Sequence, residues 1–186
     1  LLAGAVDRIH QCQARLLAVL EHRLLDRAGD YIGAQGGIAG LRRRYGKDKT
    51  FAVPILTSCA LAGLVPWRQV SPLPFELACF PQSMYRRLHL PVVSYAIPAL
   101  VAIGQARSFH RKPLNPITRL IRAASVKKSL DVLERIQPES GGFLEAAPLT
   151  SFVVMSLAGT GRAGHPVVKK GVEFLIASAR EDGSWP

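Results

Sequence analysis

Cysteine is scarce in the 186-residue sequence, and the three that occur, Cys12, Cys59 and Cys79, show no Cys-x2-Cys spacing. An odd number without that spacing indicates neither a disulfide framework nor a structural zinc site. The five histidines are scattered, and no two of them lie four residues apart as the ligand pair of a helix would. We therefore expect reduced thiols, no bound metal and no cofactor.

The sequence also lacks an apolar run that could cross a bilayer. Its most apolar stretches, residues 51–67 and 88–104, contain prolines and polar side chains. Both are shorter than the ~20 residues that a spanning helix needs. We interpret them as buried helices.

No stretch alternates cleanly between apolar and polar residues, which is the pattern of a half-buried strand. The sequence therefore predicts an all-α fold. Expected helices cover residues 1–28, 51–64, 75–80, 91–105, a segment that starts near 117, 148–157 and 166–178. Expected loops cover residues 29–40 and 81–90, and a polar linker covers residues 106–116.

Acidic residues are missing between Glu76 and Asp131. The basic residues in this interval are Arg86, Arg87, Arg107, Arg111, Lys112, Arg119, Arg122, Lys127 and Lys128. A run of one sign is most often a solvated surface. Contact with anionic lipid headgroups is the next interpretation, since each basic residue near a membrane contributes about 1 kcal/mol. Nucleic acid ranks last, because few aromatic residues interleave with the charges, and we expect no nucleic-acid partner.

The last third of the chain contains an internal repeat. Two sets of residues are separated by 42 positions each: Leu133, Gln137, Gly141 and Phe143 in the first copy, and Leu175, Ala179, Gly183 and Trp185 in the second. Each set closes a stretch with helical apolar spacing. A period in the forties with helical content is typical of stacked helical hairpins, none of which buries its own face.

The residue types explain what the repeat does. Gly141 and Gly183 can adopt the positive φ that ends a helix tightly, so that the following aromatic ring folds back over the helix end. The amide of Gln137 can stack on that ring and bond the backbone at the end of the next helix. We interpret each copy as a clasp between successive helices.

Each copy resembles the glutamine-tryptophan motif of the squalene-hopene cyclase and oxidosqualene cyclase family, basic-Gly-x2-aromatic-aliphatic-x3-Gln-x3-Gly-x-Trp. The copy at residues 170–185 keeps Lys170, Gly171, Phe174, Leu175, Gly183 and Trp185, with Ala179 in place of glutamine. The copy at residues 129–143 keeps Gln137 and Gly141, with Ser129, Val132 and Phe143 replacing the small residue, the helix aromatic and the tryptophan. Upstream, residues 61–67 and 73–77 resemble the family's Phe-Gly-Leu-x-Pro-Trp and Pro-Pro-Glu segments in the same order.

The resemblance implies an α/α toroid, an incomplete helical barrel of hairpins, over residues 50–186, preceded by an N-terminal helical segment at residues 1–49. It implies a fragment of a longer isomerase that binds a linear triterpene such as squalene and cyclises it by protonation through carbocations. It further implies a protein in the cytoplasm that lies peripherally on the inner face of the membrane, and it allows a homodimer.

The family's catalytic Asp-x-Asp-Asp segment is missing from the sequence. The resemblance places it beyond Pro186, so no catalytic residue is assigned here and the fragment alone is expected to be inactive. By comparison with the family, Tyr95, Pro148 and Phe152 would line the substrate cavity; a core tyrosine and a first helical residue are the plain alternatives for Tyr95 and Pro148. The competing hypothesis is a non-catalytic helical-repeat module that docks on lipid or on a protein partner through its basic face.

Overall fold

The computed structural model describes residues 30–31, 33–45, 49–87 and 96–185. These residues form helices and connecting turns without a strand, so the described part of the chain is all-α. The chain divides into two compact units, Leu1–Ala52 and Val53–Pro186. The helix expected over residues 1–28 lies outside the described residues.

The described part of the first unit contains α3 (Gly37–Tyr45), a short helix with Arg42, Arg43 and Arg44 in its last turn. Gly36 and Gly37 have φ values of 84° and 52°, which makes the turn that leads into this helix. The loop expected over residues 29–40 is therefore wrong for most of its described residues: 30–31, 33–34 and 37–40 are helical, and only residues 35–36 form a turn.

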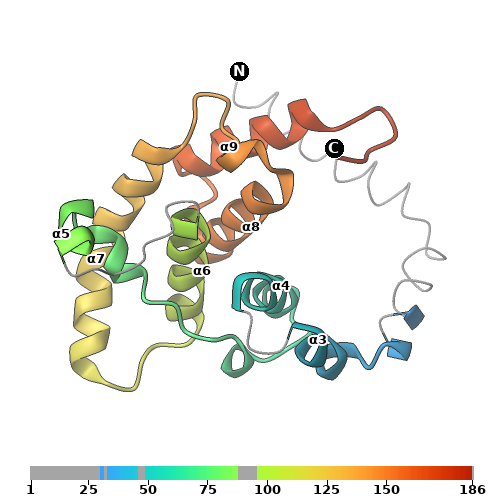
Figure 1. Cartoon of the computed structure of the whole chain (residues 1–186), viewed down its shortest axis with the longest axis horizontal. Helices are drawn as coiled ribbons and strands as arrows, with labels where there is room; N and C mark the ends of the chain where they lie inside the picture. The colour runs from blue at the N-terminus through green and yellow to red at the C-terminus, as the bar shows by residue number, and fades with distance from the viewer. Residues whose placement is uncertain (1–29, 32, 46–48, 88–95, 186) are drawn as a thin grey trace. The chain divides into compact units, whose positions relative to one another are not determined.

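The second unit is built around α6 (Ile97–His110), α7 (Pro116–Ile136), α8 (Ala147–Leu157) and α9 (Pro166–Ser178). Before them comes α4 (Lys49–Leu61), which crosses the unit boundary. The shorter elements are η1 (Trp67–Gln69), η2 (Phe75–Cys79), α5 (Gln82–Arg87), η4 (Phe143–Glu145) and η5 (Ala158–Arg162). Figure 1 shows α8 lying between α6 and α9, and α8 contacts both of these helices.

Local signals account for where the long helices begin. The side-chain oxygen of Asn115 accepts hydrogen bonds from the backbone nitrogens of Ile117 at 2.8 Å and Thr118 at 3.4 Å, and Pro116 occupies the first turn. Proline is well suited to that turn because its missing N–H would have no helical partner. Pro148 and Pro166 lie in the first turns of α8 and α9 in the same way.

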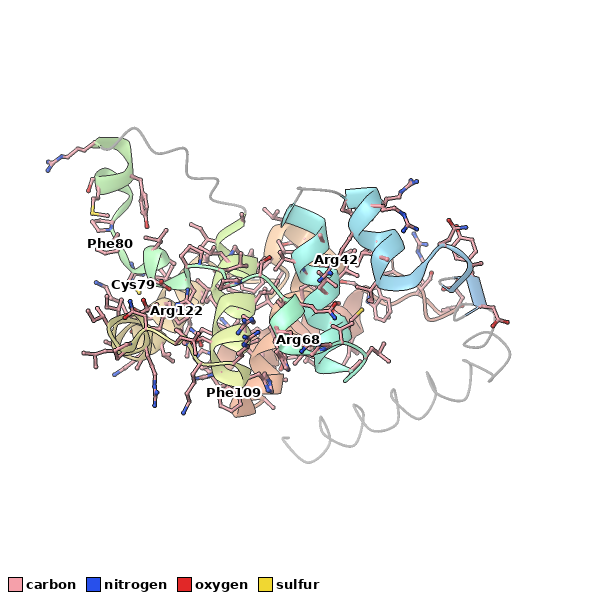
Figure 2. The ribbon with its side chains drawn as sticks, turned by 90° about the horizontal axis from the view of Figure 1, so that it is seen from below. Arg42, Arg68, Cys79, Phe80, Phe109 and Arg122 are labelled. Carbon is pink, nitrogen blue, oxygen red and sulfur yellow. The ribbon has the colours of Figure 1, made fainter. Side chains whose placement is uncertain are left out.

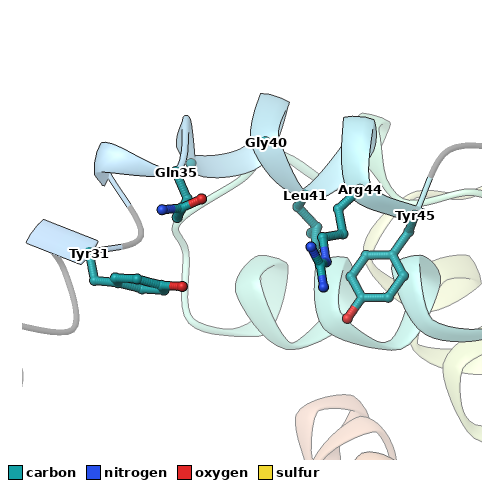
Figure 3. Close-up of a pocket in the computed structure, with 7 residues that line it drawn as sticks. Tyr31, Gln35, Gly40, Leu41, Arg44 and Tyr45 are labelled. Carbon is teal, nitrogen blue, oxygen red and sulfur yellow. The ribbon is translucent and has the colours of Figure 1, made fainter.

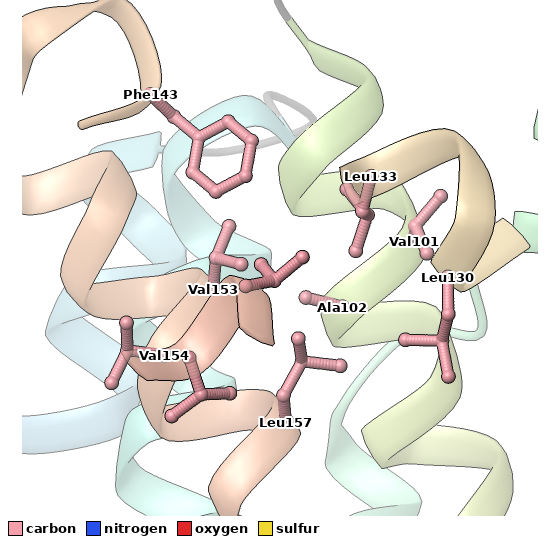
Figure 4. Close-up of a cluster of buried hydrophobic side chains, with 10 residues drawn as sticks. Val101, Ala102, Leu130, Leu133, Phe143, Val153, Val154 and Leu157 are labelled. Carbon is pink, nitrogen blue, oxygen red and sulfur yellow. The ribbon is translucent and has the colours of Figure 1, made fainter. Parts of the chain in front are cut away.

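One apolar core joins the four long helices (Figure 4). Its buried members are Val101, Ala102, Leu130, Leu133, Phe143, Val153, Val154, Leu157, Val167 and Val168. Each long helix contributes to this core, so no two of them can separate without exposing apolar surface.

Two expected boundaries differ from the structure. Helix α6 continues to His110, because Ala106 and Arg107 are buried and the Nε of Arg107 donates a hydrogen bond to the Val70 carbonyl at 2.8 Å. The polar linker therefore begins at residue 111 rather than 106. Residues 82–87, expected as loop, form α5 directly after Pro81.

Candidate functional site

The turn after α7 is tied to α9 by the side chain of Gln137. Its Nε2 donates one hydrogen bond to the carbonyl of Gly141 at 2.9 Å and another to the carbonyl of Val167 at 3.0 Å. The first bond closes the turn, and the second reaches the first turn of α9. A single amide thus holds the end of one helix against the beginning of another, with α8 between them in sequence.

Two glycines let this turn lie directly on α9. Gly141 has a φ of 88°, and a β-carbon there would lie 2.3 Å from the carbonyl oxygen of Lys170. A β-carbon on Gly142 would lie 2.4 Å from the ring of Phe174. Lys170 and Phe174 are one turn apart on α9, so the turn crosses one face of that helix. A side chain at Gly141 would push the α9 backbone away, and one at Gly142 would displace the ring of Phe174.

The aromatic residue of the first copy, Phe143, points into the core and is only 2% exposed. Its backbone nitrogen donates to the hydroxyl oxygen of Thr150 at 3.0 Å, and that hydroxyl donates in turn to the carbonyl of Ala146 at 2.9 Å. The ring therefore fills space between helices, while the backbone beneath it is bonded to α8.

Gly171 lies where α9 crosses α8. A β-carbon at this position would lie 2.7 Å from Val154 Cγ2 and 3.3 Å from Thr150 Cγ2. The glycine is buried, and its missing side chain sets the separation between the two helices. This close approach is the physical reason for a glycine at this position of the motif.

The second copy has the same turn with fewer contacts. Gly183 has a φ of 79°, and the indole Nε1 of Trp185 donates to the carbonyl of Leu175 at 2.9 Å, so the ring folds back on the helix that it follows. Trp185 is 39% exposed. Ala179 stands where Gln137 stands in the first copy, so this turn has no amide to bond a further helix.

The residues expected to line a substrate cavity are not brought together by the described structure. Tyr95 lies outside the described residues. Pro148 is exposed and Phe152 is half-buried; they are four residues apart on α8 and so lie on one side of it. Their role in substrate binding stays a prediction.

The tryptophan of the upstream segment packs on the end of α6. The rings of Trp67 and His110 are stacked, with centroids 4.4 Å apart and an angle of 9° between their planes, and Phe109 meets His110 edge-on. His110 Nε2 lies 2.9 Å from the carbonyl of Gly159, which can only accept, so this nitrogen carries the proton. The stack joins η1, α6 and η5. Phe109, next to His110 in the chain, is labelled in Figure 2.

Glu76, in the segment at residues 73–77, forms an internal ion pair with Arg122. The Nε of Arg122 lies 3.2 Å from one carboxylate oxygen of Glu76, and its NH2 donates to the Leu73 carbonyl at 3.3 Å. Its guanidinium also lies 5.8 Å from the ring centroid of Phe75. This packing of η2 on α7 is visible around Arg122 and Cys79 in Figure 2.

Two members of the basic run are therefore internal rather than surface charges. Arg122 is buried in the pair with Glu76, and Arg107 is buried with its NH1 donating to the Arg111 carbonyl at 2.9 Å. Burial, followed by the positive charges of Arg111 and Arg122, lowers the pKa of Arg107 below its usual value. The expectation of a one-sign surface is wrong for these two residues.

Sequence reasoning missed a polar seam between α6 and α7. The Nε2 of Gln105 donates to the hydroxyl oxygen of Ser129 at 2.9 Å, and this hydroxyl donates to the carbonyl of Ser125 at 2.7 Å. Among the described residues, the carbonyl oxygen of the buried Gln105 side chain finds no hydrogen-bond partner. A glutamine within an apolar helical run is the one sequence signal for such a seam.

The first unit contains an open pocket of about 370 Å³ (Figure 3). It is lined by Tyr31, Gln35, Gly37, Gly40, Leu41, Arg44 and Tyr45. None of the residues predicted to bind substrate lies in this pocket.

Two classes of site find no support among the residues that the structure describes. Within that part of the chain, no three histidine, cysteine or acidic side chains gather as metal ligands would. None of its helices combines the length and the apolar character that crossing a bilayer requires.

The fold and the two turns define the class: a chain that is all-α in its described part, with two helices, α7 and α9, that each end in a glycine-aromatic turn. The chain is 34% identical over 120 residues to a squalene–hopene cyclase of Bradyrhizobium diazoefficiens, a similarity that covers 55% of this chain and 16% of the relative. The matched region thus spans about a sixth of that protein. No family model matches the chain, and no solved structure matches it significantly.

Proposed function

We propose that this chain is part of a squalene-hopene cyclase-like isomerase, which binds a linear triterpene such as squalene and cyclises it by protonation. The observation that carries the proposal is the clasp formed by Gln137, Gly141 and Phe143, in a chain with partial similarity to a squalene–hopene cyclase. The glycine-aromatic turn recurs once, after 42 residues, and turns of this kind would join helical hairpins in series, as a closed α/α toroid requires.

In this proposal the described helices supply scaffold and part of the cavity wall. Protonating an alkene needs a strong Brønsted acid, and the carbocations that follow are stabilised by aromatic faces. The sequence contains no Asp-x-Asp-Asp segment, so the acid would come from another part of the enzyme. Tyr95, Pro148 and Phe152 are the proposed wall residues, and the chain alone would bind rather than cyclise the substrate.

We also propose that the protein lies on the inner face of the cytoplasmic membrane, where a water-insoluble substrate is dissolved. The exposed cations of the basic run support this placement, because anionic headgroups attract them. Those that the structure describes as exposed are Arg87, Arg111, Lys112, Arg119, Lys127 and Lys128.

The test is product analysis in a bacterial host that makes squalene and no cyclic triterpene. Expression of the complete gene, including the part that would supply the acid, should yield a cyclised isomer of squalene, detected by gas chromatography and mass spectrometry of the lipid extract. The Phe152→Ala variant should change the product ratio, whereas Met155→Ala, at an exposed neighbouring position on α8, should not. Squalene recovered unchanged from cells that contain folded protein would refute the cyclase proposal.

A second candidate function is a non-catalytic helical-repeat module that docks on lipid or on a protein partner. The observation that favours it is the exposed basic residues between Arg87 and Lys128. The two candidates are separated by the gene sequence that follows the Pro186 codon: an Asp-x-Asp-Asp segment there favours the cyclase, and a stop codon there favours the module.

A further inference from the structure

Helix α7 has one buried side and an opposite side that is exposed. The side chains of Arg122, Ser129, Leu130 and Leu133 are buried against η2, α6 and the core. Because successive residues turn by about 100° around a helix, these four positions share one side of α7. That side accounts for the packing of α7 in the second unit.

The opposite side of α7 begins with large apolar side chains that are exposed. Ile117, Leu120 and Ile121 are 68%, 73% and 50% exposed, and Leu114, just before the helix, is 99% exposed. Ile117, Leu120 and Ile121, with the exposed Ala124, fall within about 100° of arc around the helix and extend about 10 Å along it. We call this set, Leu114, Ile117, Leu120 and Ile121, the outer stripe of α7.

A solvated helix face carries polar residues, so an apolar stripe of this kind indicates contact with an apolar surface. The stripe is distinct from the isolated exposed side chains Met155 and Ile176 elsewhere in the unit, which are single residues on α8 and α9. Scattered apolar residues of that kind are ordinary on protein surfaces.

The charges at the two ends of the outer stripe have one sign. Arg111 and Lys112 precede it, and Lys127 and Lys128 follow it, one to two turns beyond Ile121. All four are exposed. The first acidic residue along the helix is Asp131, one turn further on. An apolar stripe between two pairs of cations has the composition of a helix that lies in the plane of a lipid interface.

We propose that the outer stripe of α7 is the surface through which this protein inserts into an anionic bilayer, with its apolar side chains at the acyl boundary and the flanking cations among the headgroups. This inference rests on the proposed membrane association and assigns it to particular residues. Long basic side chains can extend toward the headgroups while their methylene stems cover apolar surface. Phe109, which is labelled in Figure 2, is a further exposed apolar residue at the end of α6, shortly before the α6–α7 connection.

Charge complementarity favours lipid over a protein groove. Every charged residue from Arg87 to Lys128 is basic. A surface with this one sign complements the uniform negative charge of an anionic membrane. A protein partner would be expected to meet acidic and basic residues at its polar rim.

The experiment measures how the chain partitions onto vesicles of phosphatidylcholine with and without phosphatidylglycerol. The stripe variant carries Ile117→Ser, Leu120→Ser and Ile121→Ser. The matched control carries serine at three exposed apolar positions outside the stripe, Ile136, Met155 and Ile176. Circular dichroism and thermal unfolding establish that both variants keep the helical fold.

The wild-type chain should sediment with anionic vesicles, more weakly as salt rises. The stripe variant should partition at least about tenfold more weakly, because three large apolar side chains no longer enter the interface. The control variant should match the wild type. A Leu120→Trp variant should add a blue-shifted fluorescence component on binding, since its indole then leaves water.

Each other outcome overturns the inference in a different way. If the stripe variant partitions as well as the wild type, membrane association stands but the stripe is not its surface. If folded wild-type chain binds anionic and neutral vesicles equally poorly, the inference and the proposed membrane association both fail. The cyclase proposal is judged separately, by the product analysis.

Discussion

The α-carbon of Gly141 lies against the backbone of Lys170, so closely that a β-carbon would be 2.3 Å from the Lys170 carbonyl oxygen. The equivalent glycine of the second copy, Gly183, has a similar φ of 79° but no atom within 4 Å of the same site. The two turns thus share a backbone conformation and differ in what lies against them. Alanine substitutions at these two glycines therefore distinguish the cost of a strained backbone conformation from the cost of a steric clash.

We predict that Gly141→Ala lowers the free energy of unfolding by about 3 kcal/mol or more, whereas Gly183→Ala lowers it by about 1 kcal/mol. Both variants place a β-carbon in the left-handed region, which costs roughly 1–2 kcal/mol. Only the first also forces apart two backbones, which typically adds about 1–3 kcal/mol. Urea unfolding followed by circular dichroism measures both values, and equal losses would contradict the close contact with Lys170.

A second prediction concerns the amide of Gln137. Gln137→Leu keeps most of the side-chain volume but removes the donor shared by the Gly141 and Val167 carbonyls. Each lost hydrogen bond costs about 1 kcal/mol, so the free energy of unfolding should fall by about 2 kcal/mol. Glu139→Ala, at an exposed position in the same turn, is the control and should change it by less than about 0.5 kcal/mol. An unchanged Gln137→Leu stability would mean that the two bonds contribute nothing.

The contact between Trp67 and His110 gives a third prediction. His110→Ala removes both the ring stack and the hydrogen bond to Gly159. The free energy of unfolding should therefore fall by about 2 kcal/mol. His110→Phe keeps a ring for Trp67 but has no donor, so it should lose about half as much. Thermal unfolding of the two variants ranks them, and the reverse order would show that the stack does not stabilise the fold.

A fourth prediction concerns alkaline pH and Tyr85. Burial, and to a lesser degree the nearby Cys79, raises the pKa of Tyr85 above the usual value of 10.0. The folded protein therefore keeps this proton at pH values where the unfolded chain releases it. The stability from this tyrosine is complete below pH 10.0 and is lost as the pH rises through the raised pKa.

Unfolding measured on both sides of that value should show stability falling more steeply in the wild type than in Tyr85→Phe. The phenylalanine variant has no such proton, although it also loses the hydrogen bond from the Tyr85 hydroxyl to the Leu77 carbonyl at every pH. Absorbance titration of tyrosinate should show one group of the wild type titrating late, and that group should be missing from the variant. Identical pH profiles for both proteins would rule out the raised pKa.

The sequence predicted the helices best where strong local signals mark their ends. Pro166 and the apolar spacing that follows it predicted residues 166–178, and the helix observed there is Pro166–Ser178. Asn115 and Pro116 likewise explain a helix that was expected to start near residue 117. The positive φ expected at Gly141 and Gly183 is also observed. These features depend on a few neighbouring residues, which a sequence displays directly.

The errors occurred where distant contacts override composition. Arg107 lies in a segment that was expected to be a polar linker. Helix α6 nevertheless continues through it, because the guanidinium of Arg107 is buried and donates a hydrogen bond to the carbonyl of Val70. The ion pair of Arg122 with Glu76 joins residues 46 positions apart, so no local pattern distinguishes Arg122 from a surface charge. The outer stripe of α7 was missed for a related reason: apolar spacing on a helix does not say which of two faces is packed.

Gln137 and Val167 are thirty positions apart in the chain, and their hydrogen bond converts the segment between them into a closed loop. Helix α8 lies wholly within that loop, so it cannot unfold separately from its neighbours as a terminal helix can. Its amide protons should exchange with deuterium only when α7 and α9 also separate, which makes the three helices one cooperative unit.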